Sequence, residues 1–271
     1  MDKFNRNNCL FLIDKEAFLE IERIANQLHS NSYLIQSPFA LKERIKEYAL
    51  KNDVIVKIMY VPMDDSKIWG MFYEINGIYF IAINNQKPMN KQLVALAHEF
   101  YHFYAAINES ASKRDILLED QGELLIEDKK ANAFAATYLM PEATIRAILK
   151  PTDSLPSKVL QIKLLMGIFM IPYKTAVLRL LEIGFISEDD AEILLNKTSQ
   201  EVEDFINSIT FFKNNVGEIN TENVIDLDDL DIIVESNENL ELISSKKLKI
   251  DKDIILQIRK EFSNNKWRPL F

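Results

Sequence analysis

Two of the three histidines in the chain stand four residues apart, in the run LVALAHEFYHFYAA, and a glutamate follows the first of them. Residues four apart on a helix lie one above the other, so His98 and His102 can direct their imidazoles to one point beside the helix. Two imidazoles at this separation are half of a tetrahedral zinc site. Glu99 stands where its carboxylate can reach a water in an open coordination position and act as a general base.

His98, Glu99 and His102 form the HExxH pattern, which on a helix is typical of zinc metallopeptidases. The pattern also arises by chance, and two histidines on one helix face need not bind a metal. The context of the motif favours a catalytic metal site, because the motif lies in a strongly helical pattern and strand-like sequence precedes it. The spacing therefore predicts metal-assisted hydrolysis of a peptide bond.

A catalytic zinc ion needs a third protein ligand and keeps its fourth position for water. The remaining histidine, His29, lies on a distant segment with a polar face, and we expect it to be a surface residue. The third ligand should therefore be a carboxylate. The later helical run GELLIEDKKANAFAATYLMP contains three candidates, Glu123, Glu127 and Asp128.

Helix faces favour Asp128 as that ligand. Asp128 and Asn132 are four residues apart, so the carboxylate can bind the metal while the amide oxygen accepts the other ring N–H of a ligating histidine and selects its tautomer. Glu127 shares a face with apolar side chains and is the second choice. The alternative interpretation is that this acidic cluster only complements the helix dipole.

The surrounding sequence predicts the elements that position these residues. Helical patterns cover residues 14–28 and 37–52, a strand covers 53–62, and two β-rich runs flank Asn76-Gly77, a dipeptide typical of tight hairpin turns. Short helical patterns separated by Pro, Gly or Ser follow Pro141. We expect an α+β fold, namely a mostly helical zincin-like peptidase with a small β-sheet, followed by a helical module and a tail.

Shifts in composition suggest boundaries near Lys150 and Asn214. The expected units are a zincin-like metallopeptidase domain at residues 1–150, a helical module at 151–214 and an acidic-then-basic C-terminal extension at 215–271. The extension is expected to be solvated, with a partner-binding or autoinhibitory role as the alternative.

Composition narrows the class of partner. The 41 acidic residues against 32 basic ones give a net charge of -9, which should repel a nucleic-acid backbone. Cys9 is the only cysteine, so no disulfide can form within the chain. The apolar runs are too short for a signal peptide or a membrane span, and we expect a soluble cytoplasmic protein.

The run HEFYH followed by DKKANAFAATYLMP resembles the ImmA/IrrE family of metallo-endopeptidases, and the similarity covers roughly Ser37 to Ser187. The resemblance implies a zinc-dependent enzyme that cleaves a helix-turn-helix transcriptional repressor of a stress-response or mobile-element system. It also implies that the helical module at residues 151–214 is helix-turn-helix-like. The family usually has glutamate at the place of Asp128, and often Leu-Gly at the place of Phe100-Tyr101. The places of the family's second motif are held here by Ala131, Asn132, Phe134, Ala135, Ala136, Leu139, Met140 and Pro141.

The sequence leaves some features of the reaction open. The hairpin Trp69–Asn84 offers an edge strand with which an extended peptide can pair, and the alternative is an ordinary edge covered by a loop. A second group that stabilises the oxyanion is often a tyrosine. Tyr101, Tyr104 and Tyr138 are equally available for that role.

Two rival functions remain at this stage. A DNA-binding or antitoxin-like regulator on the zincin scaffold would use the helices of residues 157–187, but PYKTAVLRLLEIG offers only Lys174 and Arg179 as basic residues. The second rival is a metal-stabilised interaction protein with lost or latent catalysis, in which the Cys9 thiolate blocks the metal. A small buried hydrophobic residue is the simpler interpretation of Cys9.

Overall fold

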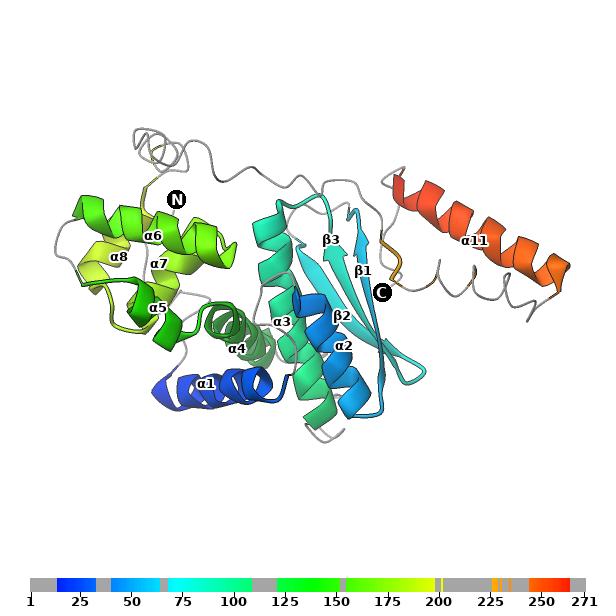
Figure 1. The fold of residues 1–271 in the computed structure, drawn as a ribbon, viewed down its shortest axis with the longest axis horizontal. Coiled ribbons are helices and arrows are strands. Elements are labelled where there is room, and N and C mark those ends of the chain that lie inside the picture. The colour runs from blue at the N-terminus through cyan, green and yellow to red at the C-terminus, as the bar shows by residue number, and fades with distance from the viewer. Residues whose placement is uncertain are drawn as a thin grey trace.

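The computed structural model describes residues 14–32, 40–63, 68–108, 121–151, 155–197, 201, 226–228, 230, 234 and 244–263, without the side chains of 121–125, 155–156 and 261–263. Helices predominate and the strands form one small sheet, which confirms the expected α+β class (Figure 1). The elements are α1 (Lys15–Ser30), α2 (Leu41–Lys51), β1 (Ile55–Val61), β2 (Gly70–Ile75), β3 (Ile78–Asn84), α3 (Met89–Asn108), α4 (Gln121–Leu139), α5 (Glu142–Ile148), α6 (Leu155–Phe169), α7 (Tyr173–Glu182), α8 (Glu188–Leu195) and α11 (Ser245–Ser263).

Local sequence signals account for several helix ends. The Asp14 side chain accepts the backbone N–H of Ala17 at 2.9 Å and so caps α1. Ser187 and Asp190 form a reciprocal capping box at the start of α8. Pro141 separates α4 from α5, because a proline at this point cannot continue the helical hydrogen bonding of α4.

The three strands lie in the order β1-β3-β2. β2 and β3 form the predicted antiparallel hairpin, and both Asn76 and Gly77 have the positive φ angles, 53° and 79°, that a tight turn of this kind requires. β1 pairs with β3 in parallel, so β2 forms one edge of the sheet.

α3 lies along one face of the sheet, and α2 lies beside it (Figure 1). Alternate strand residues point to this face, where the Phe72 ring of β2 stacks on Tyr79 of β3 and both approach Phe103 of α3. Buried apolar residues from α1 to α8 form one continuous cluster with these side chains. The helices that follow Lys150 therefore share a core with those that precede it; Asn214, the second expected boundary, lies outside the described residues.

α6 and α7 lie in the region for which a helix-turn-helix-like module was expected. The helices are bent by 110° at the turn formed by residues 170–172, where Met170 has a φ of 53°. Within the described part of the chain no single helix has the length and apolar composition of a membrane span, and only this bent pair, taken together, passes such a test.

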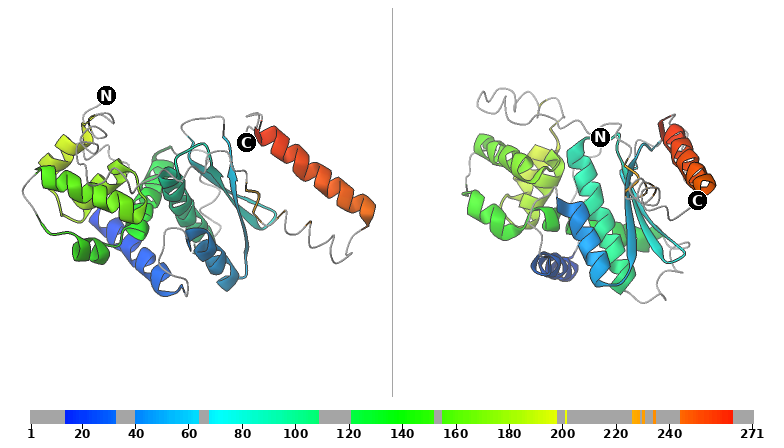
Figure 2. Two further views of the ribbon diagram at one scale, coloured as in Figure 1. Left: turned by 45° about the horizontal axis from the view of Figure 1, so that its top comes forward. Right: turned by 45° about the vertical axis from the view of Figure 1, so that its right-hand side comes forward.

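The opposite face of the sheet is covered by residues from the C-terminal extension. In all three views α11 lies on the side of the sheet away from α3, at the end of the molecule opposite α5 to α8 (Figures 1 and 2). A second, smaller hydrophobic cluster joins the sheet to this part of the chain. Its buried members are Val61, Met63, Ala82 and Leu227, and the residues packed against them include Leu230, Ile255 and Ile258.

Residues 226–228 also close the outer edge of β1. Tyr60 and Asp226 exchange both backbone hydrogen bonds, at 2.9 and 3.0 Å, as in an antiparallel bridge. The backbone N–H of Ile58 donates to the Asp228 carboxylate at 3.3 Å. The N–H groups of β1 that face away from β3 are thus paired at Ile58 and Tyr60.

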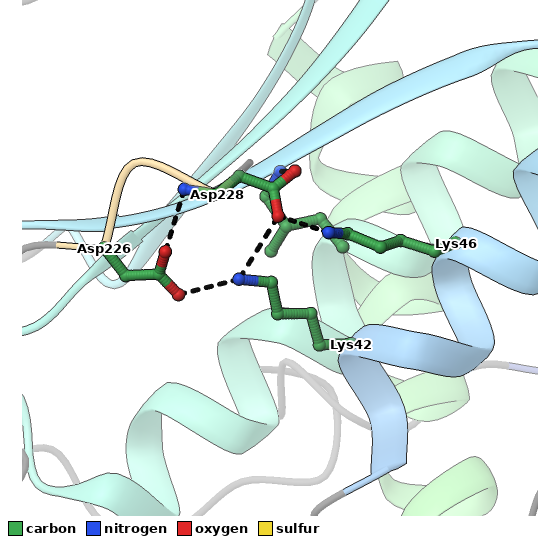
Figure 3. Close-up of polar contacts among 5 residues, drawn as sticks. Lys42, Lys46, Asp226 and Asp228 are labelled. Atoms are coloured by element: carbon green, nitrogen blue, oxygen red, sulfur yellow. Dashed lines mark hydrogen bonds and ion pairs between the residues drawn. The ribbon is translucent and has the colours of Figure 1, made fainter. Parts of the chain in front are cut away.

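Two lysines of α2 hold this segment by ion pairs. Lys42 Nζ lies 2.7 Å from an Asp226 carboxylate oxygen and 3.3 Å from one of Asp228, and Lys46 also donates to Asp228 (Figure 3). The Asp228 side chain is almost completely buried, so its charge depends on these partners. We call residues 226–228 with Lys42 and Lys46 the C-terminal clasp.

Candidate metal centre

The first half of the centre lies on α3, which is packed on several sides. Leu96, Phe100 and Phe103 are almost completely buried and hold the helix against the sheet and α4. With α3 held in this way, the helical spacing carries His98 and His102 to the same side, facing α4. The two rings meet edge to face, with centroids 4.9 Å apart.

Three donor atoms converge between α3 and α4. The Nε2 atoms of His98 and His102 lie 3.1 Å apart, and Asp128 Oδ1 lies 3.9 and 3.7 Å from them, respectively. The nearest point equidistant from atoms with these separations is about 2.1 Å from each, which is the length of a zinc–nitrogen bond. These residues therefore fit a zinc ion, and they are the group of potential metal ligands found among the described side chains.

Asn132 sets the tautomer of the first histidine. His98 Nδ1 lies 2.9 Å from the amide oxygen of Asn132, which only accepts hydrogen bonds, so Nδ1 carries the proton. The Nε2 of His98 is then left with a lone pair that points to the position between the three donors. Ligating histidines in metal sites are commonly held in this way by a partner beyond the ligands.

Glu127, the second candidate for the carboxylate ligand, is engaged elsewhere. Its Oε2 accepts from the Tyr101 hydroxyl at 3.3 Å, and its Oε1 pairs with Lys130 at 2.8 Å. Tyr101, which stands where the family often has glycine, is buried and packs against Phe134. The Glu123 side chain lies outside the described residues. The arrangement supports Asp128 as the third ligand.

Burial and charge set the protonation of the centre. Burial raises the pKa of Glu99 to about 7 and, with the neighbouring His102, lowers the pKa of His98 to about 4. Burial also lowers the pKa of His102, but its interaction with Asp128 and the charge of Glu99 outweigh this effect and raise it. The same interaction lowers the pKa of Asp128.

One residue next to the centre escaped the sequence analysis. Gly70 begins β2 and lies against Glu99, so closely that a Cβ atom at position 70 would be 2.8 Å from Glu99 Oε1. A glycine inside a strand pattern signals a close approach of another group, and this was the available clue. The backbone beside Gly70 is held by Asn84, which is fully buried and binds the Trp69 and Ile68 carbonyls through its N–H groups, at 2.9 Å each.

His29 is not the surface residue that the sequence suggested. Its ring is partly buried and stacks on Tyr138, with Nε2 2.8 Å from the Tyr138 carbonyl oxygen and Nδ1 3.1 Å from a guanidinium nitrogen of Arg44. The expectation was wrong because a polar helix face was taken as solvent-facing, whereas α2 and α4 cover this part of it. His29 lies in a structural contact and not in the metal centre.

The three candidate tyrosines occupy different surroundings. The Tyr138 ring lies between His29 and Phe100, and the Tyr104 ring lies beside Tyr48, 5.9 Å between centroids. The Tyr101 hydroxyl donates to Glu127. The geometry therefore assigns none of them as the group that stabilises the oxyanion.

The centre agrees with the comparison with known families. Residues 52–181, which run from β1 to the last residue but one of α7 and include every residue of the centre, match the family model Peptidase_M78, described as the IrrE N-terminal-like domain. This part of the chain is an ImmA/IrrE-family domain. The ImmA/IrrE match supports a metallopeptidase-type function. A comparison with curated proteins found no match.

Proposed function

We propose that the protein is a zinc-dependent endopeptidase in which His98, His102 and Asp128 hold the metal and Glu99 is the general base. The observation that carries the proposal is the convergence of the three donor atoms, at 3.1 to 3.9 Å from one another, beside a buried Glu99. A zinc ion there would supply Lewis-acid chemistry, acidifying water and polarising the carbonyl of the scissile bond.

The residues of the chain have separate tasks in this reaction. Glu99 takes the proton of the attacking water and returns it to the leaving amine, a role that suits a carboxyl whose pKa is about 7 in its buried site. His98 and His102 present lone pairs, and Asn132 keeps the His98 ring in the required tautomer. The half-exposed Asp128 side chain lies on the open side of the centre.

An extended segment of a protein is the proposed substrate, paired with β2, which forms one edge of the sheet among the described strands. The clasp pairs the outer edge of β1, whereas β2 forms the other edge and begins at Gly70, in contact with Glu99. A peptide that adds to β2 would therefore pass close to the general base. By resemblance to the family, we propose a helix-turn-helix transcriptional repressor as the substrate, which would place the reaction in the cytoplasm.

The deciding experiment combines metal analysis with cleavage. The purified protein and a Glu99→Gln variant are assayed for bound zinc and incubated with a helix-turn-helix repressor encoded beside this gene. We expect about one zinc per chain in both proteins and a rate lowered about 10²- to 10⁴-fold in the variant. Equal rates, or a parent that does not bind zinc, would contradict the proposal; metal binding without cleavage of this repressor would refute only the choice of substrate.

One of the two basic residues that a DNA-binding regulator would use, Arg179, is not available to contact DNA in the structure. Arg179 is 1% exposed and directs its side chain inward, with Nε donating to the Met140 carbonyl at 3.1 Å and Nη1 pairing with Glu182 at 2.7 Å. Lys174 remains exposed on α7. A gel-shift assay at increasing salt tests the rival directly, since tight and salt-sensitive DNA binding would support it.

A further inference from the structure

The contact between Gly70 and Glu99 joins the edge strand to the general base. A Cβ atom on Gly70 would lie 2.8 Å from Oε1 and 3.1 Å from Cγ of Glu99, and 3.2 Å from Cδ1 of Ile83, its partner residue on β3. The first distance is shorter than real Cβ contacts allow, and the other two are tight. The Glu99 side chain therefore packs directly against the backbone of Gly70 and occupies the space that a side chain at position 70 would need.

A methyl group at position 70 has few ways to be accommodated. The strand cannot retreat easily, because Gly70 is paired with Ile83 and the preceding Trp69 carbonyl accepts the Asn84 backbone N–H at 2.9 Å. The flexible partner is the Glu99 side chain, so the carboxylate and its Cγ would have to move away from the strand. A movement of this size would displace the group that must meet the attacking water.

We infer that Gly70 is a positioning residue, whose missing side chain sets the place of the Glu99 carboxylate beside the metal centre. The inference rests on the proposed function for its catalytic consequence, but the contact itself can be tested without catalysis. The position requires glycine for space and not for backbone conformation: among the φ angles of the described glycines, those of Gly77 and Gly184 are positive, and that of Gly70 is not.

A double-mutant cycle, measured by thermal unfolding of the metal-free protein, tests the contact. We expect Gly70→Ala to lower the melting temperature by about 3 to 8 °C, as overpacking does in a chain of this size. In the Glu99→Ala background the same change should cost much less, because the Oε1 and Cγ atoms are then absent and only the 3.2 Å contact with Ile83 Cδ1 remains tight. An equal loss in both backgrounds would overturn the inference, whether or not the protein is a peptidase.

Kinetics on the zinc-loaded protein test the consequence. Gly70→Ala should lower kcat about 10²-fold with little change in KM, because a displaced general base impairs the reaction more than substrate binding. The loss should be much smaller in the Glu99→Gln background, where no general base remains to be displaced. A change confined to KM, or an equal loss in both backgrounds, would show that Gly70 does not act through Glu99.

Gly167→Ala is the matched control. Gly167 lies in α6, its φ is not positive, and a Cβ atom there meets nothing within 4 Å. This control should keep the parent's kcat and zinc content and should melt at the same temperature or slightly higher. If Gly167→Ala lowered kcat as much as Gly70→Ala, a general effect of the added methyl group would replace the proposed contact.

Discussion

The amide oxygen of Asn132 lies 2.9 Å from His98 Nδ1, so a residue of α4 selects the tautomer of a residue of α3. Replacing Asn132 by alanine should therefore weaken zinc binding by about 10- to 100-fold without removing a ligand. Competition titration with a zinc chelator measures the change. Asn132→Asp, which keeps an acceptor at this position, should lose less affinity; equal affinities for the alanine variant and the parent would contradict the role.

Zinc affinity also decides between the two neighbouring carboxylates. Asp128→Asn should weaken zinc binding more than Asn132→Ala does, because it removes the charge of a proposed ligand whose Oδ1 lies 3.7 Å from His102 Nε2. Glu127→Gln should bind zinc as the parent does, since Glu127 is held by Tyr101 and Lys130. The reverse order in the same titration would assign the ligand to Glu127.

The C-terminal clasp should contribute to stability through the edge of β1. Replacing Lys42 and Lys46 by alanine leaves the buried Asp228 carboxylate without its cations and should lower the free energy of unfolding by roughly 1–3 kcal/mol. Backbone hydrogen exchange should also become faster at Ile58 and Tyr60, whose N–H groups donate to the clasp.

Lys174→Ala serves as the control for the clasp, because Lys174 is an exposed lysine on α7, far along the chain from these residues. It should change neither the unfolding free energy nor the exchange of the two amides. Unchanged exchange at Ile58 and Tyr60 in the double variant would show that residues 226–228 do not depend on the lysines.

His29 should make stability fall in mild acid. Burial, together with the charge of Arg44, lowers its pKa below the ordinary value of 6.5, so the unfolded chain binds a proton there more readily than the folded one. The stabilisation is complete above pH 6.5 and is lost as the pH falls towards the lower folded pKa. Urea unfolding at several pH values should show a smaller loss on acidification for His29→Gln than for the parent, and identical losses would refute this origin.

Some features of the centre depend only on residues that are close together in the sequence. His98, Glu99 and His102 lie within one turn of a helix, so the 3.6-residue period alone places both imidazoles on one side. The Asn76-Gly77 turn is equally local, because two residues that tolerate positive φ determine a hairpin between β-rich runs. The ANxFAAxLMP pattern was recognised by its order and spacing, which are also properties of the sequence.

Other features could be seen only in the folded structure, because they depend on how the helices pack. The choice between Asp128 and Glu127, one residue apart on α4, depends on how that helix is rotated against α3, and this is set by side-chain packing over many turns. The burial of Arg179 and of His29 follows from helices that cover them, which no periodicity of their own segments reveals.

The sequence by itself thus determined the motif helix, the hairpin and the class of chemistry, because these depend on residues within a few positions of one another. Only the tertiary structure decided that Gly70 limits the place of Glu99, that the histidine oriented by Asn132 is His98, and that residues 226–228 close the edge of β1. The last two contacts join residues that are 34 positions apart (His98 and Asn132) and 170 positions apart (Ile58 and Asp228), and the physical reason is that such pairs form only when the whole core packs.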